Sequence, residues 1–400
     1  MRRMAALAAT IAGLGAAGVE ARHRRQPGNA LECADTGWAA ERSAADRLQV
    51  GGRLVLHNPQ QTREVMVREL VPTIRLFGGG PTDELTVEAR VHSDDKEYPT
   101  RADGNWASYV VKPASYGKDR FVDVRFEVCG PPSQLDALQA AWVTVDFDTY
   151  GYEGCRARNH HLMVPLAYPD DPAGADAGAD GDSGAAWREV DGGSVLAVRT
   201  HLLVPGDDIV EVVARYAAPL ARPGDIVAIG ESPLAVMQRR MLDPSQVDIG
   251  WFASRACQFM SGEGSVGTAV GMQALVDQVG VTRVFAGLVG GVLGKLAGQA
   301  GWFYRICGEQ SKLIDDVTGT LAPYDRFVVL GPLDSDRVCA EIAASTGLEA
   351  VVVDANDLGR VDVIGASDGA SAGLVCRALR SNPAGNADEG TPLVLIRPAP

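Results

Sequence analysis

The sequence predicts two folded domains, an all-β antiparallel sandwich followed by a mixed α/β domain. Three observations lead to this fold class. Apolar and polar residues alternate from about Arg53 to Tyr168, a stretch with almost no large apolar residue follows, and helical patterns alternate with short apolar runs beyond Val195. The length of 400 residues suits this division, because a domain usually takes roughly 100–200 residues. We expect an extension, a sandwich, a linker and an α/β domain over residues 1–30, 31–168, 169–190 and 191–400.

The composition is that of a globular protein with an acidic balance. Hydrophobic residues make up 46% of the chain and charged residues 22%, which excludes a collagen, a coiled coil and a wholly disordered chain. Acidic residues outnumber Lys and Arg by 51 to 37, so the chain as a whole lacks the basic surface that binds nucleic acid by counterion release, and we expect no nucleic-acid partner. The seven cysteines include no C-x-x-C pair, and we expect mostly reduced thiols in the core.

The N-terminal segment leaves three interpretations open. Met1-Arg2-Arg3 precedes a weakly apolar stretch, as in a secretory signal, but glycines dilute that stretch and a second basic run follows at Arg22–Arg25. We expect a plain extension on a cytoplasmic protein. A signal peptide and a peripheral membrane anchor remain the alternatives.

Three runs with a period of two predict half-buried strands in the first domain. They cover residues 85–91, 122–128 and 143–147. Turn signals at Gly78-Gly79-Gly80-Pro81 and Gly130-Pro131-Pro132 separate such runs. This spacing is typical of an antiparallel sandwich, whose binding partner the sequence leaves open.

The boundary between the domains is predicted from composition. Residues 169–186 are rich in Pro, Gly, Ala and Asp and contain almost no large apolar side chain, so burial cannot compensate for the entropy of ordering them. Their aspartates do not form an EF-hand loop. With Gly181 at loop position six, Gly178 falls at position three and Trp187 at position twelve, and neither is a calcium ligand.

The second domain is expected to alternate short strands with helices. Asp207-Asp208 is a cap for a helix reaching Ala217, and Asp334-Ser335-Asp336 is a cap for a helix that stops at Gly347. A further helix is expected over residues 371–379. Strands are expected over residues 226–229, 327–330, 348–353, 361–364 and 392–396.

The titratable residues limit the chemistry of the second domain. No histidine follows His201, so we expect a site there to work without imidazole, which excludes Ser-His-Asp catalysis and His-ligated zinc. Carboxylates remain, at Asp315-Asp316 and at Asp354-Ala355-Asn356-Asp357. Such hard oxygen ligands suit Mg²⁺ or Mn²⁺ beside nucleotide phosphates. The same residues are favoured in turns and helix caps, and their spacing alone favours that structural role.

A glycine-rich segment resembles a phosphate loop only superficially. A Walker A motif would need Gly where Val289 stands and Ser or Thr where Leu296 stands. Glycines at 287, 290, 291 and 294 instead predict a closely packed helix or a buried loop. The only lysines after residue 118 are candidates for phosphate contacts, and we add one arginine and one serine, giving Lys295, Lys312, Arg305 and Ser232.

Four segments of the second domain, taken in their order and spacing, match a known pattern. They are Gly224–Ser232, Asp315–Val317 leading into Leu330–Pro332, Val352–Arg360 with the sequence VVDANDLGR, and Asn386–Pro392. On these segments, residues from about 195 to 398 resemble the coenzyme F-420:L-glutamate ligase (γ-glutamyl ligase) superfamily.

The resemblance implies a mixed α/β ligase-like domain that uses GTP, or ATP, with Mg²⁺ or Mn²⁺. Such enzymes activate a small-molecule carboxylate as an acyl phosphate, which the amine of glutamate or a similar amino acid attacks. The resemblance assigns metal-ligand roles to Asp354, Asp315, Asp316 and Glu389, and gives Arg360 and Asn356 the task of orienting phosphate or substrate. It also implies a homodimer with the active site near the subunit contact.

Several features depart from that family's pattern. The stretch Cys307–Asp316 lacks the family's Ala-Asn-Ala-Gly-x-Asp run, and neither the glycine-rich segment near Gly290 nor the preceding β domain belongs to the stand-alone enzyme. We therefore predict a divergent, metal-dependent amide ligase of the kind used in coenzyme F420 biosynthesis. The alternative is a non-catalytic nucleotide-sensing or partner-binding protein, with a degenerate ligase-like domain and a sandwich for recognition. A secretory signal would favour that alternative.

Overall fold

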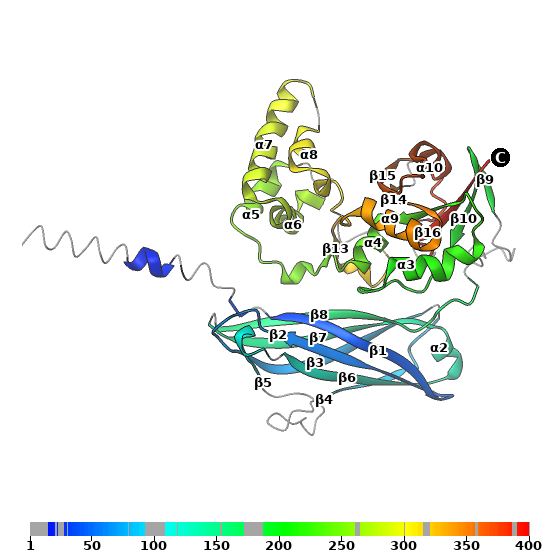
Figure 1. The fold of residues 1–400 in the computed structure, drawn as a ribbon. Coiled ribbons are helices and arrows are strands. Elements are labelled where there is room, and N and C mark those ends of the chain that lie inside the picture. The colour runs from blue at the N-terminus through cyan, green and yellow to red at the C-terminus, as the bar shows by residue number, and fades with distance from the viewer. Residues whose placement is uncertain are drawn as a thin grey trace, which may run out of the picture. The chain divides into compact units, whose positions relative to one another are not determined.

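In the computed structural model the chain forms two compact units. Figure 1 labels their helices and strands. One unit comprises Met1–Arg75, Pro81–Ala137 and Val143–Leu162, and the other comprises Leu76–Gly80, Leu138–Trp142 and Met163–Pro400. The structure describes residues 15–20, 22, 28–29, 31–78, 80–92, 109–117, 119–152, 154–171, 187–260, 265–299, 301–314, 321–356, 359–385 and 390–399.

Two predictions fall largely outside these ranges. Of the N-terminal extension, residues 15–20 form an exposed helical stretch. Most of the rest of the extension, and residues 172–186 of the predicted linker, lie outside the described residues.

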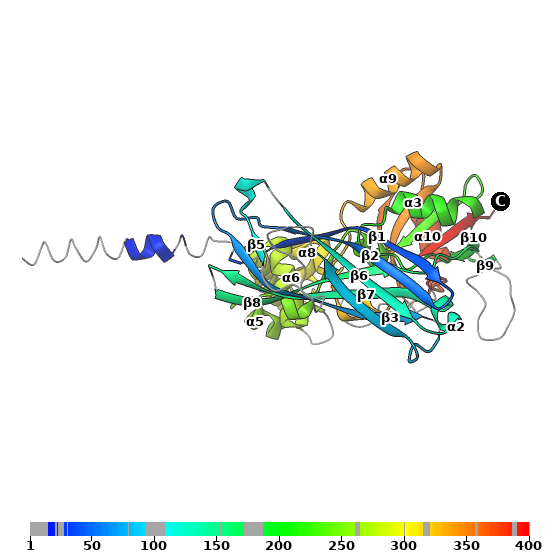
Figure 2. The same ribbon diagram turned by 90° about the horizontal axis from the view of Figure 1, so that it is seen from below.

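The first unit is an antiparallel sandwich of two four-stranded sheets, as predicted (Figure 2). One sheet has the order β1-β2-β6-β4, with bounds Glu32–Ala44, Arg47–His57, Arg120–Cys129 and Thr86–His92. The other has the order β5-β3-β7-β8, with bounds Tyr109–Val111, Val65–Gly78, Leu138–Gly151 and Gly154–Pro165. Two short helical turns, η1 and α2, cover Ala114–Tyr116 and Pro132–Asp136.

The period-two pattern decides which side chains form the sandwich core. Along β6, Val122, Val124 and Val128 are fully buried and Phe126 is 3% exposed, whereas Arg125 between them points outward. Because successive side chains of a strand point to opposite faces, the same strand supplies a core face and a solvent face.

The second unit is built on a mixed six-stranded sheet, which confirms the α/β prediction. Within it β11 and β14 are parallel, while the other neighbouring strands are antiparallel. The sheet has the order β15-β14-β11-β16-β10-β9, with bounds Val361–Ala366, Glu349–Ala355, Ile226–Gly230, Leu393–Pro398, Gly193–Val198 and Arg188–Val190. A separate pair joins β12 to β13, at Met241–Leu242 and Val328–Val329.

Helices and short turns pack around this sheet and beside it. The α-helices are α3 (Ile209–Val212), α4 (Glu231–Met237), α5 (Ala253–Ala256), α6 (Ala269–Val279), α7 (Val281–Leu296), α8 (Trp302–Cys307), α9 (Ser335–Thr346) and α10 (Ala372–Ala378). Asp208 caps α3 as predicted, accepting a hydrogen bond from the backbone N of Val210 at 2.8 Å. The chain then continues through a π-turn, η3 (Val213–Ala217), to the expected end at Ala217. Further short turns are η4 (Ala218–Leu220), η5 (Pro244–Gln246), η6 (Cys257–Phe259), η7 (Ser265–Gly267), η8 (Glu309–Ser311) and η9 (Tyr324–Arg326).

One predicted cap differs in detail. Asp334 precedes α9 in a left-handed conformation, with φ 51°, and its side chain makes no capping hydrogen bond. Its carboxylate instead lies 3.5 Å from the guanidinium of Arg337. The helix ends where expected, because Gly347 takes the left-handed conformation that closes a helix at its C-terminus.

The glycine-rich segment is a helix packed closely on its neighbour, which confirms the structural interpretation. Gly287, Gly290 and Gly294 of α7 are buried and face α8. A Cβ atom at Gly287 would lie 2.5 Å from Sγ of Cys307. The two helix backbones can therefore approach only because these positions lack side chains.

The helices α6 and α7 are both strongly apolar. Among the described residues, no single helix combines the length and hydrophobicity needed to cross a bilayer. Ala269–Val279 and Val281–Leu296 reach that threshold only as a pair, across a bend of 116°.

Candidate functional site

Strand register brings several separate chain segments to one edge of the six-stranded sheet. This edge is the side where β11 and β14 end and where β15 and β16 begin. The parallel strands β11 and β14 place Gly230 opposite Val353, so the residues that follow both strands emerge together. Antiparallel pairing brings the start of β16 to this edge, with Leu393 opposite Ile229. The start of β15 joins them, since Val361 pairs with the last residue of β14. The carboxyl ends of adjacent parallel strands are where α/β sheets usually bind ligands.

The end of β14 and the loop from β14 to β15 hold three of the predicted site residues. Asp354 is the penultimate residue of β14 and is partly buried. Asn356 closes the loop, because its side-chain Oδ1 accepts from the backbone N of Arg360 at 3.2 Å and its own N donates to Arg360 O at 3.0 Å. This is the turn chemistry that the sequence also allowed, and it fixes where the Arg360 side chain leaves the loop.

Asp354 sits in an electrostatic environment that disfavours its ionised form. Burial raises the pKa of the Asp354 carboxyl above its ordinary value, and the nearby Asp362 carboxylate raises it further, while the Arg360 guanidinium lowers it. Arg360 is engaged mainly elsewhere, since its Nε donates to Asp362 Oδ2 at 3.0 Å. A cation near Asp354 would therefore be favourable.

A buried carboxylate that the sequence interpretation missed lies at the same edge. Glu231 follows β11 directly, opens α4 and is only 8% exposed. The predicted residue Ser232 is next to it in the same first turn. The signal in the sequence is that only Gly230 separates Glu231 from the unbroken apolar run Ile226–Ile229, where a chain has not yet left the core.

The expectation that the second domain offers no imidazole is wrong, because His201 lies within it. Thr200 extends the sheet beyond β10 by donating its backbone N to Gly390 O at 3.1 Å, so His201 reaches this edge. The His201 side chain is 8% exposed, with Nδ1 2.8 Å from Oη of Tyr216 and Nε2 3.2 Å from Oδ2 of Asp207. Both ring nitrogens are thus used in local hydrogen bonds, which fix the segment that follows β10.

The remaining predicted residues are placed differently. Asp315, Asp316 and Glu389 lie outside the described residues, although Gly390, which follows Glu389, is at the edge. The candidate phosphate contacts divide into two groups. Ser232 lies at the edge, whereas the other three belong to the helical part of the unit, on α7, on α8 and after η8 respectively, as Lys295, Arg305 and Lys312.

The donor chemistry at the edge fits a hard divalent cation in part. Within the described ranges, no three His, Cys, Asp or Glu side chains lie close enough together to hold a metal ion. Asp354 is the one predicted ligand that those ranges include. Its carboxylate oxygens are the type of donor that Mg²⁺ and Mn²⁺ prefer.

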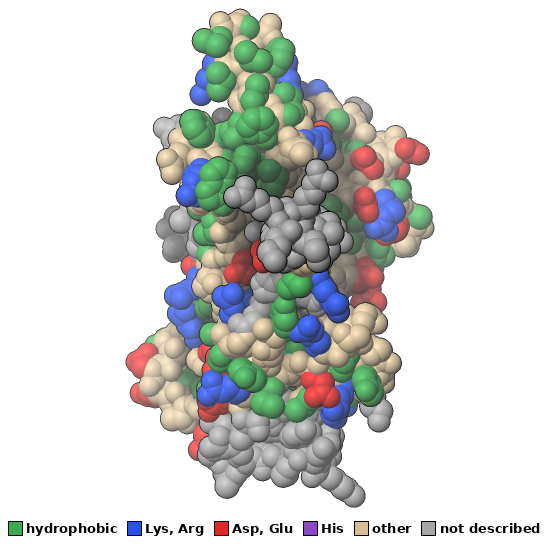
Figure 3. Space-filling view, turned by 90° about the vertical axis from the view of Figure 1, so that its left-hand side faces the viewer, with side chains coloured by type: hydrophobic (Ala, Val, Ile, Leu, Met, Phe, Trp, Pro, Cys, Tyr) green, Lys and Arg blue, Asp and Glu red, His purple; other side chains and the backbone are tan. Residues whose placement is uncertain are grey.

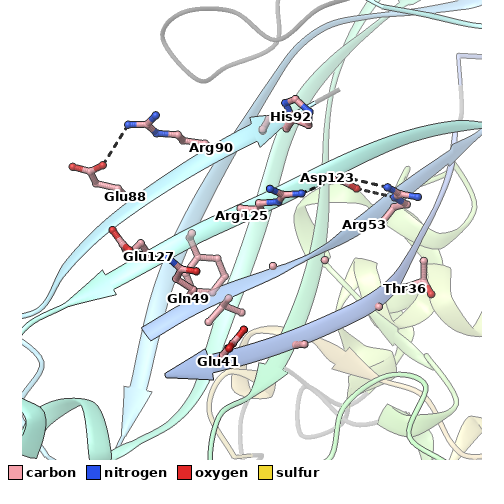
Figure 4. Close-up of a pocket in the computed structure, with 17 residues that line it drawn as sticks. Thr36, Glu41, Gln49, Arg53, Glu88, Arg90, His92, Asp123, Arg125 and Glu127 are labelled. Carbon is pink, nitrogen blue, oxygen red and sulfur yellow. Dashed lines mark hydrogen bonds and ion pairs between the residues drawn. The ribbon is translucent and has the colours of Figure 1, made fainter. Parts of the chain in front are cut away.

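The first unit contributes a second candidate site, a hollow of about 1060 Å³ on the sheet β1-β2-β6-β4 (Figure 4). Charged and polar side chains from all four strands line it, together with apolar surface. The labelled side chains in Figure 4 are Thr36, Glu41, Gln49, Arg53, Glu88, Arg90, His92, Asp123, Arg125 and Glu127. Sequence reasoning missed this surface, because period-two alternation identifies an outward face but does not show that the face is concave.

An ion-pair network organises the floor of this hollow. Arg53 Nε donates to Asp123 Oδ1 at 2.7 Å, and Arg125 Nη2 lies 3.7 Å from Asp123 Oδ2. The hydrogen bond from Arg53 lowers the pKa of the Asp123 carboxyl. Burial is the next largest effect and opposes it, while the charges of Arg53 and Arg125 lower the pKa further. The hollow therefore presents both charge signs, as a surface for a polar or zwitterionic ligand would.

Comparison with known families identifies the first unit. Residues 32–168 match the family model described as F420-0:gamma-glutamyl ligase, N-terminal Ig-like domain. The sandwich is therefore a feature of that family, and the expectation that it departs from the family is wrong. A search of curated proteins found no match to the chain.

Solved structures share only a distant likeness with the chain. The GAE domain of GGA2p from Saccharomyces cerevisiae is 8% identical with a TM-score of 0.20, and the alignment covers 34% of this chain and 100% of that one. AggA, the major subunit of aggregative adherence fimbriae type I from Escherichia coli, is 12% identical with a TM-score of 0.18, covering 33% of this chain and 92% of that one. Likeness at this level supports no conclusion about function.

Two separate parts of the chain thus resemble parts of the same family. The strand-end segments of the second unit resemble the γ-glutamyl ligases, and the first unit matches the model of their N-terminal Ig-like domain. The match of residues 32–168 supports the resemblance of this chain to the F420-0:gamma-glutamyl ligase family.

Proposed function

We propose that the chain is a nucleotide- and divalent-metal-dependent amide ligase of the γ-glutamyl type, acting on a small-molecule carboxylate. The observation that carries this proposal is the convergence of Asp354, the Asn356–Arg360 turn and Ser232 at one edge of the sheet. In the proposed reaction the carboxylate accepts the γ-phosphoryl group of GTP or ATP. The amine of glutamate or a similar amino acid then attacks the acyl carbon, forming the amide and releasing phosphate.

The described residues would contribute positioning and charge compensation, which dominate catalysis of phosphoryl transfer. Arg360, which is exposed at the end of its loop, would orient a phosphate or a substrate carboxylate. Asn356 would hold that loop in shape through its hydrogen bonds with the Arg360 backbone. Ser232 would contact a phosphate from the first turn of α4.

Asp354 would hold the divalent cation, together with Asp315, Asp316 and Glu389. The bound cation would supply neutralisation of phosphate charge. Because burial and Asp362 raise the pKa of Asp354, occupation by a cation would also stabilise the ionised carboxylate. A reaction that consumes GTP or ATP favours the cytoplasm as its compartment. The family resemblance further suggests a homodimer.

Thermal-shift and calorimetric titrations test the proposal. The chain is titrated with GTP and with ATP, each with and without Mg²⁺ or Mn²⁺, because a ligand raises stability by RT ln(1 + [L]/Kd). We expect metal-dependent nucleotide binding that Asp354→Asn weakens by at least about tenfold, the lower end of the usual effect of disturbing a metal site. The matched control is Asp368→Asn, an exposed aspartate that follows the other end of β15. Binding that is absent, or unaffected by Asp354→Asn in a folded protein, would contradict the proposal.

The hollow of the first unit favours a second candidate function, recognition without catalysis. Its charged lining is large enough for a polar small molecule or a peptide segment. In this case the second unit would bind nucleotide or partner without turning over substrate. Nucleotide binding with no amide formation from any tested carboxylate and amino acid would favour this alternative.

A further inference from the structure

The helix α7 carries an apolar stripe along its outer side. Six apolar side chains, each three or four residues from another member of the set, are 44–80% exposed: Val281, Phe285, Val289, Val292, Leu293 and Leu296. Figure 3 shows hydrophobic side chains gathered over the α7–α8 hairpin at the top of that view, with Lys and Arg side chains at its margins. Together the six side chains expose on the order of 500 Å² of apolar surface, an area typical of an interaction site.

The stripe is not an unfinished part of the core. The opposite side of α7 already packs on α8 through its glycines, where a Cβ at Gly294 would lie 2.8 Å from Cγ of Trp302. The 116° bend at Gly280 turns α7 away from α6, so the stripe faces outward along about 24 Å of helix. Both sides of α7 are therefore apolar. One side packs on α8, and no described residue covers the other side.

The charge of the hairpin is opposite to that of the whole chain. Residues 281–307 include Arg283, Lys295 and Arg305 but no Asp or Glu, in a chain whose net charge is −14. Lys295 is exposed in the last turn of α7, beside Leu296 of the stripe. Trp302, which opens α8, is 37% exposed. Apolar and aromatic side chains flanked by cations are the pattern of a helix that lies in the interface of an anionic bilayer.

We infer that the α7–α8 hairpin docks the protein on an anionic phospholipid surface, with the stripe of α7 lying in the headgroup region and Lys295 and Arg305 beside lipid phosphates. This inference goes beyond the proposed ligase function and does not depend on it. It describes peripheral attachment, in which the helix lies along the surface rather than across it.

Charge complementarity favours this occupant over a second copy of the chain. A symmetric contact between two stripes would bring the cations of both hairpins together with no carboxylate from either hairpin to compensate them. An anionic bilayer supplies a phosphate for each cation. The rest of the molecule, being acidic, would be repelled by the same surface, so attachment would be confined to the hairpin.

Vesicle flotation of the full chain tests the inference. Vesicles of phosphatidylcholine alone are compared with vesicles that also contain phosphatidylserine, at low and high NaCl. We expect binding that requires phosphatidylserine and that high salt weakens. The double variant Leu293→Gln/Leu296→Gln should weaken it at least about tenfold, because it removes two of the most exposed apolar groups. Lys295→Glu should weaken it and reduce its salt dependence. The control Leu333→Gln changes a leucine that is 45% exposed outside the hairpin and should bind like the unaltered chain.

The other outcomes would overturn the inference. Binding that the double variant leaves unchanged would place attachment elsewhere in the chain. A concentration-dependent dimer, seen by sedimentation velocity without vesicle binding and lost in the double variant, would make the stripe an interface between copies. If circular dichroism shows that the double variant is unfolded, the nearly isosteric pair Val289→Thr/Val292→Thr replaces it. Absence of vesicle binding by the unaltered chain would also refute the inference.

Discussion

Arg397, on the last strand of the chain, holds Asp225, at the start of β11, through two hydrogen bonds. Nε of Arg397 donates to Oδ1 at 2.9 Å, and its Nη2 donates to Oδ2 at 2.6 Å. The Asp225 side chain is only 2% exposed, and the Arg397 guanidinium also stacks on the ring of Trp187 at 3.7 Å. The pair and Trp187 therefore link three parts of the same sheet, which are the segment before β9, the segment before β11 and the C-terminal strand β16.

Asp225→Asn should lower the free energy of unfolding of the second unit by about 3 kcal/mol, because it leaves a partly buried guanidinium without its charged partner. Urea denaturation followed by circular dichroism measures the change. The control Glu341→Gln breaks the exposed helical pair between Arg337 and Glu341 and should leave stability nearly unchanged. If the two substitutions lowered the free energy of unfolding equally, burial of the Asp225–Arg397 pair would contribute nothing to stability.

Gly294→Ala should destabilise the α7–α8 hairpin. A Cβ there would lie 2.7 Å from the backbone oxygen of Gln299, which cannot move away easily. Overpacking of this kind costs about 1–3 kcal/mol, which exceeds the gain of at most about 1 kcal/mol from replacing glycine in a helix.

Hydrogen exchange of the α7 and α8 amides measures this effect locally. The control is Gly373→Ala in α10, where the nearest atom to the new Cβ is Nη1 of Arg377 at 3.8 Å. That substitution should be neutral or stabilising. Slower exchange in the Gly294→Ala hairpin would refute the packing argument.

The stability contributed by Asp123 should depend on pH. Its pKa in the folded protein is lowered, first by the hydrogen bond from Arg53, so the folded state favours the ionised carboxylate. The contribution is then fully present above the ordinary pKa near 3.8 and is lost as pH falls through the lowered value. The deficit of Asp123→Asn relative to the unaltered chain should be largest near neutral pH and should shrink in strong acid.

Urea titrations of both proteins at a series of pH values measure this deficit. Asp136→Asn serves as the control, because its carboxylate is 71% exposed in its pair with Arg42. A deficit for Asp123→Asn that stays constant down to strong acid would contradict the assigned role of Arg53.

Two thiols should react at very different rates in the folded protein. Burial, assisted by the nearby Asp336 carboxylate, raises the pKa of Cys339 to about 12, so almost none of it is thiolate at pH 8. Cys155 is exposed. Peptide mapping after brief alkylation should find Cys155 labelled and Cys339 unlabelled, while denatured protein should label at both. Early labelling of Cys339 in the folded protein would show that α9 opens readily.

Glu231→Gln tests the buried carboxylate that lies beside Ser232. The change keeps the size and shape of the side chain but removes its charge, in a residue that is only 8% exposed at the edge of the sheet. If the proposed ligase function holds, metal-dependent nucleotide affinity should fall about tenfold or more, as for loss of an outer partner of a metal site. Calorimetry measures it, with Glu211→Gln in α3 as a control. Unchanged affinity would confine Glu231 to a structural role.

Strands, helices and turns could be predicted where their residue patterns involve only neighbours in the chain. Alternation along residues 122–128 places one face of β6 toward the core, and the glycines of 287–294 predicted a closely packed helix or a buried loop, of which the structure shows the helix. The turn role of Asn356 also follows from residue type, and the structure shows that role. The burial of Glu231 did not follow, since a glutamate in the first turn of a helix is usually exposed.

The sequence by itself thus determined the order of a sandwich followed by an α/β region, several of the strands and helices, and the carboxylate at the C-terminal end of β14. Tertiary structure alone decided that Gly230 pairs with Val353, which brings Ser232 and Asp354 to one edge, and that the stripe of α7 stays uncovered. The physical reason is the range of the interactions. Periodicity and turn chemistry act between neighbours in the chain, whereas strand register and the choice of buried helix face depend on packing between segments that are distant in sequence.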